Sequence, residues 1–484
     1  MDTLNTFSRR QFLRTTSCGF GALAWSALAS RQALAESAAT ASSRAIAGAE
    51  FARFAHHLPR AKRVIFLFMQ GGVSHVDSFD YKPRLARDDG KTMPFDDARQ
   101  RANTGQGQSS QRVMMSPWRF SRHGQCGRWV SELFPEMARH VDRLCVLHGL
   151  HTEGIAHGPA TLFLHCGATT QVRPSMGSWV LYGLGPENEN LPGFVTISPS
   201  AGNGGVRNYG SAFLPAEFQG TALGKAGSPA EKATIHNLAG FESTSEQRGR
   251  LDALQRLNAL QSERYPHDSE LEAAIRSYDL AWRMQRVAPE VLDLSRETPQ
   301  SLARYGIGEK ATDNFGRQCL LARRFCEAGV RYIQVTYGDN TANPAWDQHS
   351  NLPKHADHAR AVDKPIAGLL EDLSDRGLLD DTIVWWGGEF GRTPYAEKNG
   401  TGRDHNPEGF TVWLCGGGIK PGIAFGQTDE FGHRAIADKV HMHDLHATIL
   451  HQLGLDHERL TFRYAGRDFR LTDVAGRVVR DVIG

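Results

Sequence analysis

Residues 63–69 read RVIFLFM and run into the glycine pair Gly71-Gly72. After Arg63 every position of this stretch is apolar, whereas a strand with one face in water would alternate apolar and polar residues. An unbroken run is typical of a strand that is buried on both faces of a parallel sheet. We therefore expect a central buried strand at residues 63–69.

The rest of the chain repeats this pattern in alternation with helical spacing. Further apolar runs occur at residues 144–147, 194–197, 332–335, 382–386 and 410–414. Helical periodicity occurs at residues 131–141, 159–166, 315–328, 355–376 and 444–453. This alternation predicts an α/β fold with a mostly parallel central sheet and helices on both faces. In such sheets ligands bind beyond the carboxyl ends of the strands, where we expect Gly71, Gly338, Gly387 and Gly416.

The N-terminal residues have the order of an export signal. The heptapeptide SRRQFLR at residues 8–14 is followed by an apolar stretch at residues 15–29 and by Ala33-Leu34-Ala35. Paired arginines before Phe-Leu are the twin-arginine signature, and the small residues mark a cleavage site. We therefore expect residues 1–35 to be a signal peptide that the twin-arginine translocase reads, and the mature protein to be periplasmic or located at the cell surface.

The remaining chain divides into a short lead and one large domain. Residues 36–60 are rich in Ala and Ser, which is typical of a flexible lead, and residues 61–484 hold the predicted sheet. A long helical pattern at about residues 246–296 predicts an insertion, either a cap or an interaction arm. No later stretch reaches the roughly 18 apolar residues of a spanning helix, so none is expected after signal cleavage.

The composition of the chain excludes some partners and favours a metal. Lysine plus arginine at 55 against aspartate plus glutamate at 53 leaves a net charge of +2, so we expect no nucleic-acid partner. The chain also contains 21 histidines, many of them near acidic residues. Clustered imidazoles and carboxylates are the groups that divalent metals bind.

Two short segments each place a carboxylate beside an imidazole, just after a predicted strand. They are Trp346-Asp347-Gln348-His349 and Arg403-Asp404-His405. A divalent ion is bound by such mixed oxygen and nitrogen ligands when the loops are fixed by a rigid sheet. The alternative interpretation of each pair is a hydrogen-bonded turn or a surface pair.

A third segment, GGEFGRTP at residues 387–394, carries Glu389 and Arg392. The planar guanidinium of an arginine suits the oxygens of phosphate or sulfate, which would make Arg392 an anion-binding residue. Alternatively, Arg392 pairs with Glu389 and ties the loop.

The order of these segments resembles the alkaline phosphatase, phosphomutase and sulfatase superfamily over most of residues 60–455. The stretch HGPATLFLHCG at residues 157–167 aligns with the helix that opens on the nucleophile of that superfamily. The resemblance implies a catalytic role for His157, as nucleophile or general base; a metal ligand or a capping residue are the alternatives. Gln70 and Phe390 stand where the superfamily has an aspartate and a histidine. The segments at residues 387–394 and 402–405, with the closing helix, narrow the resemblance to the bacterial family known as domain of unknown function 1501.

The sequence thus predicts an exported metal-dependent hydrolase of sulfate or phosphate esters. The predicted catalytic residues are His157 and Arg392. The predicted metal ligands are Asp347, His349, Glu389, Asp404 and His405, for a divalent ion that could be Zn, Ca, Mg or Mn. The alternative function is a non-catalytic binding or cell-surface assembly protein that keeps the fold and a depleted metal site.

Overall fold

The structure is a computed structural model that describes residues 55–96, 110–235, 238, 244–265, 269–341, 343–397 and 400–484. The predicted signal peptide at residues 1–35 lies outside the described residues, and so does most of the predicted lead at residues 36–60. The described residues divide into two compact units: residues 244–265 and 269–271 belong to the smaller unit, and the other described residues belong to the larger.

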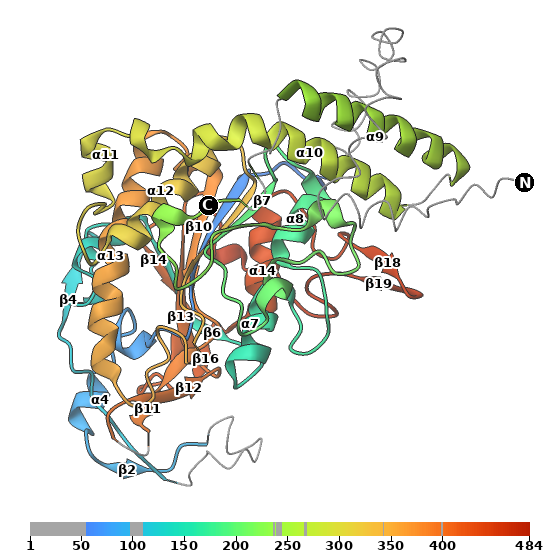
Figure 1. Cartoon of the computed structure of the whole chain (residues 1–484). Helices are drawn as coiled ribbons and strands as arrows, with labels where there is room; N and C mark the ends of the chain where they lie inside the picture. The colour runs from blue at the N-terminus through green and yellow to red at the C-terminus, as the bar shows by residue number, and fades with distance from the viewer. Residues whose placement is uncertain are drawn as a thin grey trace, which may run out of the picture. The chain divides into compact units, whose positions relative to one another are not determined.

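A nine-stranded sheet forms the centre of the larger unit (Figure 1). Its strand order is β14 (Ile423–Phe425), β6 (Cys145–His151), β13 (Phe410–Cys415), β10 (Thr382–Gly387), β1 (Arg63–Met69), β9 (Tyr332–Tyr337), β7 (Phe194–Ile197) and β8 (Thr221–Leu223), and β17 (Val440–His441) pairs with β6. All strands run in one direction except β13, which is antiparallel to β10 and β6. The prediction of a mostly parallel sheet is therefore confirmed.

The direction of β13 corrects one prediction about the edge of the sheet. Gly416 follows β13, and a side chain at this position would collide with the carbonyl of Thr382, the first residue of β10. Gly416 therefore lies at the edge where β10 begins, opposite the edge where Gly387 ends that strand. An apolar run gives no sign of strand direction, which is why the sequence did not reveal this.

Both faces of the sheet are covered, and β1 shows why. Its side chains alternate between two apolar cores, because successive residues of a strand point to opposite faces. One face, with Ile65, Leu67 and Met69, packs against α12 (Asp313–Glu327) and α13 (His355–Asp375). The other face, with Val64, Phe66 and Phe68, packs against α7 (His157–Cys166), α8 (Met176–Leu184) and α14 (Met442–Gln452). Figure 1 shows these two groups of helices on either side of the strands.

Five two-stranded sheets surround this core in the described part of the chain. They are β2 (Thr92–Met93) with β3 (Gln111–Arg112), β4 (Phe120–His123) with β5 (Arg128–Ser131), β11 (Gly391–Ala396) with β12 (Arg403–Asn406), β15 (Gln427–Thr428) with β16 (Ala435–Ala437), and β18 (Phe462–Tyr464) with β19 (Arg467–Phe469). The segment at residues 403–406, expected as a loop, is thus a strand. The shorter helices are α4 (Pro83–Arg87), α6 (Pro135–Ala138) and α11 (Pro299–Arg304).

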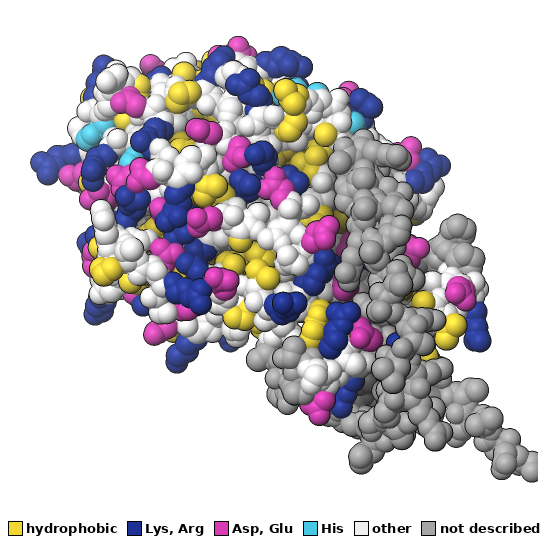
Figure 2. All heavy atoms as spheres, turned by 90° about the horizontal axis from the view of Figure 1, so that it is seen from above, with side chains coloured by type: hydrophobic (Ala, Val, Ile, Leu, Met, Phe, Trp, Pro, Cys, Tyr) yellow, Lys and Arg dark blue, Asp and Glu magenta, His cyan; other side chains and the backbone are white. Residues whose placement is uncertain are grey.

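The range of the predicted insertion contains α9 (Thr244–Arg264) and α10 (Ser269–Leu292). Among the described residues, no helix is long and apolar enough to cross a membrane. Figure 2 shows one face of the molecule, on which Lys and Arg side chains are interspersed with Asp and Glu.

Candidate metal centre

The carboxyl edge of the sheet gathers the predicted site residues. Because β9, β1 and β10 are parallel neighbours, the segments that follow them meet at this edge. Gly71 follows β1 with a positive φ of 107°, and a side chain there would collide with the carbonyl of Pro344. Only glycine therefore lets the loop that carries Asp347 pack directly on the end of β1.

The other residues reach this edge from three further elements. Glu389 follows β10, and His157 is the first residue of α7. The antiparallel pair β11 and β12 places Arg392 opposite His405. The site is therefore assembled from segments far apart in the sequence, and its geometry depends on the sheet.

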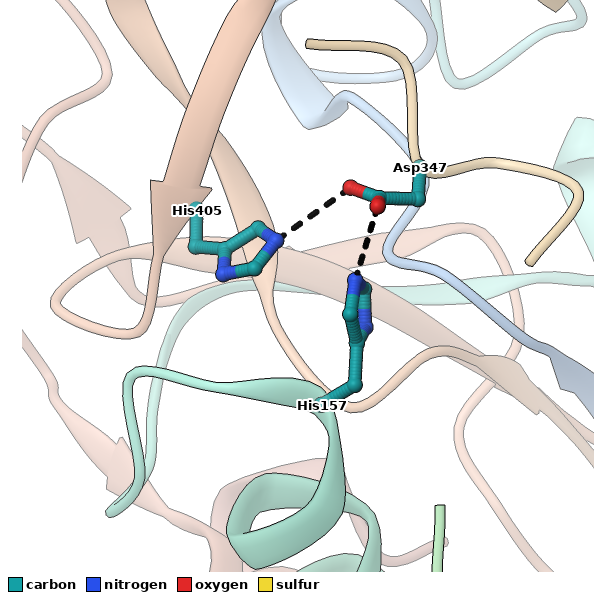
Figure 3. A group of neighbouring side chains, drawn as sticks. All are labelled: His157, Asp347 and His405. Atoms are coloured by element: carbon teal, nitrogen blue, oxygen red, sulfur yellow. Dashed lines mark hydrogen bonds and ion pairs between the residues drawn. The ribbon is translucent and has the colours of Figure 1, made fainter. Parts of the chain in front are cut away.

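Three imidazoles converge on the carboxylate of Asp347. His157 Nε2 lies 3.1 Å from Asp347 Oδ2, and His405 Nε2 lies 3.2 Å from Asp347 Oδ1 (Figure 3). His349 Nε2 lies 3.0 Å from the same Oδ1 and 3.0 Å from His405 Nε2. The proximity of Asp347, His349 and His405 that the sequence predicted is observed, and His157 points toward them.

Each of these imidazoles is held from behind at its other ring nitrogen. His157 Nδ1 lies 2.7 Å from Glu389 Oε1, and His405 Nδ1 lies 2.8 Å from the carbonyl oxygen of Ile155. His349 Nδ1 lies 3.1 Å from Glu397 Oε1. Carbonyl and carboxylate oxygens only accept hydrogen bonds, so we assign the proton of each ring to Nδ1.

With the protons on Nδ1, each Nε2 carries a lone pair that faces Asp347. Lone pairs and a carboxylate repel one another unless a cation lies between them. Histidines that bind metals show this same arrangement, in which the second ring nitrogen donates to a carboxylate or a backbone carbonyl. The cluster is therefore a candidate cation site. One group of possible ligands consists of His157, Asp347 and His405, and a second of His349, Asp404 and His405.

The ionisation of these groups follows from their surroundings. Burial lowers the pKa of His405 well below its usual value, which keeps this imidazole neutral. Burial would raise the pKa of Asp347, but the charge of Arg392, whose guanidinium binds this carboxylate, holds it well below its usual range. Burial would also lower the pKa of His157, but hydrogen bonds with Asp347 and Glu389 raise it. A proton on His157 and a metal ion are thus alternative cations for the same place.

Two of the predicted ligands lie behind the imidazoles. Glu389 is fully buried, and besides His157 it accepts hydrogen bonds from the backbone N–H of Gly71 at 3.0 and 3.1 Å. Asp404 Oδ1 accepts from the N–H of His405 at 2.7 Å and lies 3.7 Å from His349 Nδ1. The structure therefore places both carboxylates where they orient imidazoles.

Glu397 belongs to the site but was not predicted from the sequence. It follows β11, and its carboxylate reaches His349 because the hairpin of β11 and β12 folds back over the edge of the sheet. No motif marks this residue, so only the geometry of the hairpin could have revealed it.

Arg392 is fully buried and is bound to Asp347, not to Glu389. Its Nη2 lies 2.6 Å from Asp347 Oδ1 and also donates to the carbonyl of Gly71. Its Nε donates to the carbonyl of Gly72 at 3.0 Å, and its Nη1 donates to that of Arg403 at 3.2 Å. In this conformation the guanidinium supports the ligand carboxylate, and its donors are not presented to a substrate anion.

A second buried ion pair lies beside the first. Arg403 Nε donates to Asp77 Oδ2 at 2.7 Å and its Nη2 donates to Oδ1 at 3.1 Å, and both side chains are completely buried. Asp77, the first carboxylate after β1, is thus committed to an arginine.

These features define an α/β protein with a candidate metal centre at the carboxyl edge of a mostly parallel sheet. Residues 61–483 match the family described as "Protein of unknown function (DUF1501)", and the chain belongs to this family. The family resemblance that the sequence indicated is therefore confirmed. No curated protein matches the chain.

Comparison with solved structures finds matches in the alkaline phosphatase and sulfatase superfamily, all at low identity and low TM-score. The lipoteichoic acid synthase LtaP from Listeria monocytogenes has 8% identity and a TM-score of 0.33, with 88% of this chain and 80% of that chain covered. The sulfatase PsFucS1 from Pseudoalteromonas sp. has 11% identity and a TM-score of 0.35, with 82% and 69% covered. The alkaline phosphatase from the Antarctic bacterium TAB5 has 10% identity and a TM-score of 0.29, with 75% and 94% covered. Likeness at this level carries no argument about activity.

Proposed function

We propose that this protein is an exported hydrolase of phosphate or sulfate esters that depends on one divalent metal ion. The observation that carries the proposal is the convergence of three Nε2 atoms on Asp347, with every Nδ1 held by an acceptor. Export is inferred from the paired arginines of the N-terminal segment, Arg9 and Arg10.

The donor set favours zinc among the ions considered. Ligands bonded to zinc at about 2.0–2.1 Å in a tetrahedron lie about 3.3 Å from one another. His157 Nε2 and His405 Nε2 lie 3.1 and 3.2 Å from the carboxylate oxygens of Asp347, so a small adjustment would accommodate the ion. Calcium and magnesium prefer sites made of oxygen atoms, whereas imidazole nitrogens suit zinc.

His157, Asp347 and His405 would hold the ion, and the fourth position of the tetrahedron would stay open on the side of His349. When bound, a zinc ion supplies a Lewis acid and a water of lowered pKa, so hydrolysis at this site needs no serine or threonine nucleophile. Arg392 keeps the Asp347 carboxylate oriented, and Glu389 keeps His157 Nε2 directed at the site. His349 is the most exposed of the four, with 20% of its side chain accessible, so substrate would enter on its side.

An anionic ester is favoured because α7 begins at His157. The first N–H groups of a helix have no partners within it, and the helix dipole is positive at this end. A phosphate or sulfate group beside His157 would therefore lie against a favourable potential.

The test combines metal analysis with an ester screen. Protein purified with its native metal should contain one divalent ion per chain and should hydrolyse chromogenic phosphate or sulfate esters. Asp347→Asn and His405→Ala should lose both the ion and the activity, whereas Asp363→Asn, a buried carboxylate on α13, should keep both. Protein without an ion after exposure to zinc would contradict the proposal.

A second candidate function is a non-catalytic binding or assembly protein. The observation that favours it is the pair of arginines, since Arg392 already offsets Asp347 and Arg403 already offsets Asp77. Stoichiometric zinc without turnover of any ester would select this candidate.

A further inference from the structure

A cavity with a volume of about 340 Å³ lies next to the hairpin of β4 and β5. Residues from three places line it: Asp80 and Tyr81 after β1, His148 on β6, and Arg122, Arg128 and Trp129 on the hairpin. Its size is in the range of small-molecule sites. None of these residues belongs to the metal centre, and the inference below does not depend on the proposed function.

Two aromatic side chains form one wall of the cavity. Tyr81 and Trp129 are 36% and 37% exposed, and their ring centroids lie 4.7 Å apart. Tyr81 is held in place by stacking on Phe120 at 4.9 Å. The exposed parts of these two rings offer apolar surface with polar atoms at its edge, which suits the apolar C–H groups of a sugar ring.

Two arginines on the hairpin have no carboxylate partner among the described residues. The guanidinium carbon of Arg122 lies 5.1 Å from the ring centre of Trp129, and Arg128 Nε is buried without a hydrogen-bond partner in the described part of the chain. By contrast, the nearby Lys82 pairs with Asp80 at 3.0 Å. A buried guanidinium nitrogen without a partner is costly, and an anionic group of a ligand would remove that cost.

The polar residues that line the cavity complete the site. His148 Nδ1 forms a hydrogen bond with Thr411 Oγ1 at 3.2 Å. Burial lowers the pKa of His148, so its ring is neutral. A neutral imidazole bonds well to a hydroxyl group. Asp80 forms an ion pair with Lys82 and accepts a hydrogen bond from the hydroxyl of Thr428. The negative charge of Asp80 is therefore compensated within the protein.

We infer that this cavity binds a pyranose that carries one anionic group. The ring would lie on Trp129 and Tyr81, the anionic group would pair with Arg128 and Arg122, and a hydroxyl would reach His148. The aromatic rings, the two arginines and the histidine each contact a different part of such a sugar. A neutral sugar would leave the two arginines without an anionic partner.

The test is a titration with D-glucuronate, in which binding is measured by calorimetry. D-glucuronate should bind saturably, and D-glucose and inorganic sulfate should each bind at least about tenfold more weakly. Arg128→Gln, Arg122→Gln and Trp129→Ala should each weaken glucuronate binding by about tenfold or more. The control variant is Arg119→Gln. Arg119 directly precedes the same hairpin, is exposed and pairs with Glu132, so its replacement should leave glucuronate binding unchanged.

Three results would overturn the inference. They are the absence of saturable glucuronate binding, equal binding of inorganic sulfate and glucuronate, and full binding by Arg122→Gln. If Arg128→Gln unfolds at a lower temperature than the wild type, its binding result is not used, and the result for Arg122→Gln decides. Arg122 is exposed, so its replacement should not affect folding. Asp347→Asn should bind glucuronate normally, which separates this site from the metal centre.

Discussion

Replacing Glu389 with glutamine tests whether the carboxylates behind the imidazoles set the metal affinity. Glu389 accepts from His157 Nδ1 at 2.7 Å and from the N–H of Gly71 at 3.0 and 3.1 Å, and it is fully buried. A glutamine of the same shape has one oxygen and one NH₂ group. Whichever way the amide lies, its NH₂ group faces either the His157 Nδ1–H or the Gly71 N–H, and two donors then oppose each other in a dry site.

The expected size of the effect follows from this loss. Removing a partner that orients a metal-binding imidazole typically weakens metal affinity about 10- to 100-fold. This corresponds to about 1.4–2.7 kcal/mol of binding free energy. The loss should appear in the affinity for zinc and not merely in stability, because the change acts on the direction and basicity of His157 Nε2.

The assay is a competition titration of zinc against a chromophoric chelator at constant pH. Asp363→Asn is the matched control, since Asp363 is also buried and also accepts two backbone N–H groups, from Glu136 at 2.7 Å and Met137 at 2.9 Å. The control should change stability and leave zinc affinity intact. Wild-type zinc affinity in Glu389→Gln would refute the assigned role of Glu389 and the proton assignment for His157.

Three further predictions concern acid stability, a buried ion pair and export. Burial, with His443 nearby, lowers the pKa of His446 to about 3, so between about pH 6.5 and 3 the unfolded chain binds a proton that the folded protein does not. The free energy of unfolding should therefore fall as the pH falls, and His446→Gln should reduce this slope by up to about 1.4 kcal/mol per pH unit in urea titrations. Arg403→Met leaves Asp77 buried and unpaired and should cost about 3–5 kcal/mol in urea unfolding, and equal stability would contradict the pairing. Replacing Arg9 and Arg10 with lysines should stop export in a fractionation assay, and export of the wild type without the twin-arginine translocase would disprove the signal assignment.

The sheet could be predicted because buried strands leave a strong signal. All six predicted apolar runs lie within or overlap strands of the central sheet. The short strands β8, β14 and β17 gave no such run, and all three were missed. Strand direction was also invisible, because β13 and β10 are equally apolar although they run in opposite directions. Whether a short segment forms a strand, and in which direction a strand runs, both depend on its pairing with segments far away in the sequence.

The candidate site was predictable in its members but not in their roles. Carboxylate–imidazole pairs after strands indicated Asp347, His349 and His405, since chain order and a parallel sheet bring strand ends together. The sequence could not tell that Arg392 binds Asp347 and not Glu389, because the register of β11 and β12 sets the direction of the guanidinium. Side-chain direction depends on tertiary contacts that no local pattern encodes.

The formal charges at the site favour a bound metal ion, because the guanidinium of Arg392 alone does not compensate the carboxylates. Asp347, Glu389 and Glu397 lie at or behind the imidazoles, and Arg392 is the cation bound to Asp347. Arg403 cannot contribute, since Asp77 already compensates it. One guanidinium against three carboxylates leaves an excess of negative charge in a mostly buried region, and such an excess is costly unless a cation offsets it. A divalent ion between Asp347 and the three Nε2 atoms would offset most of this charge at the one place where lone pairs already converge.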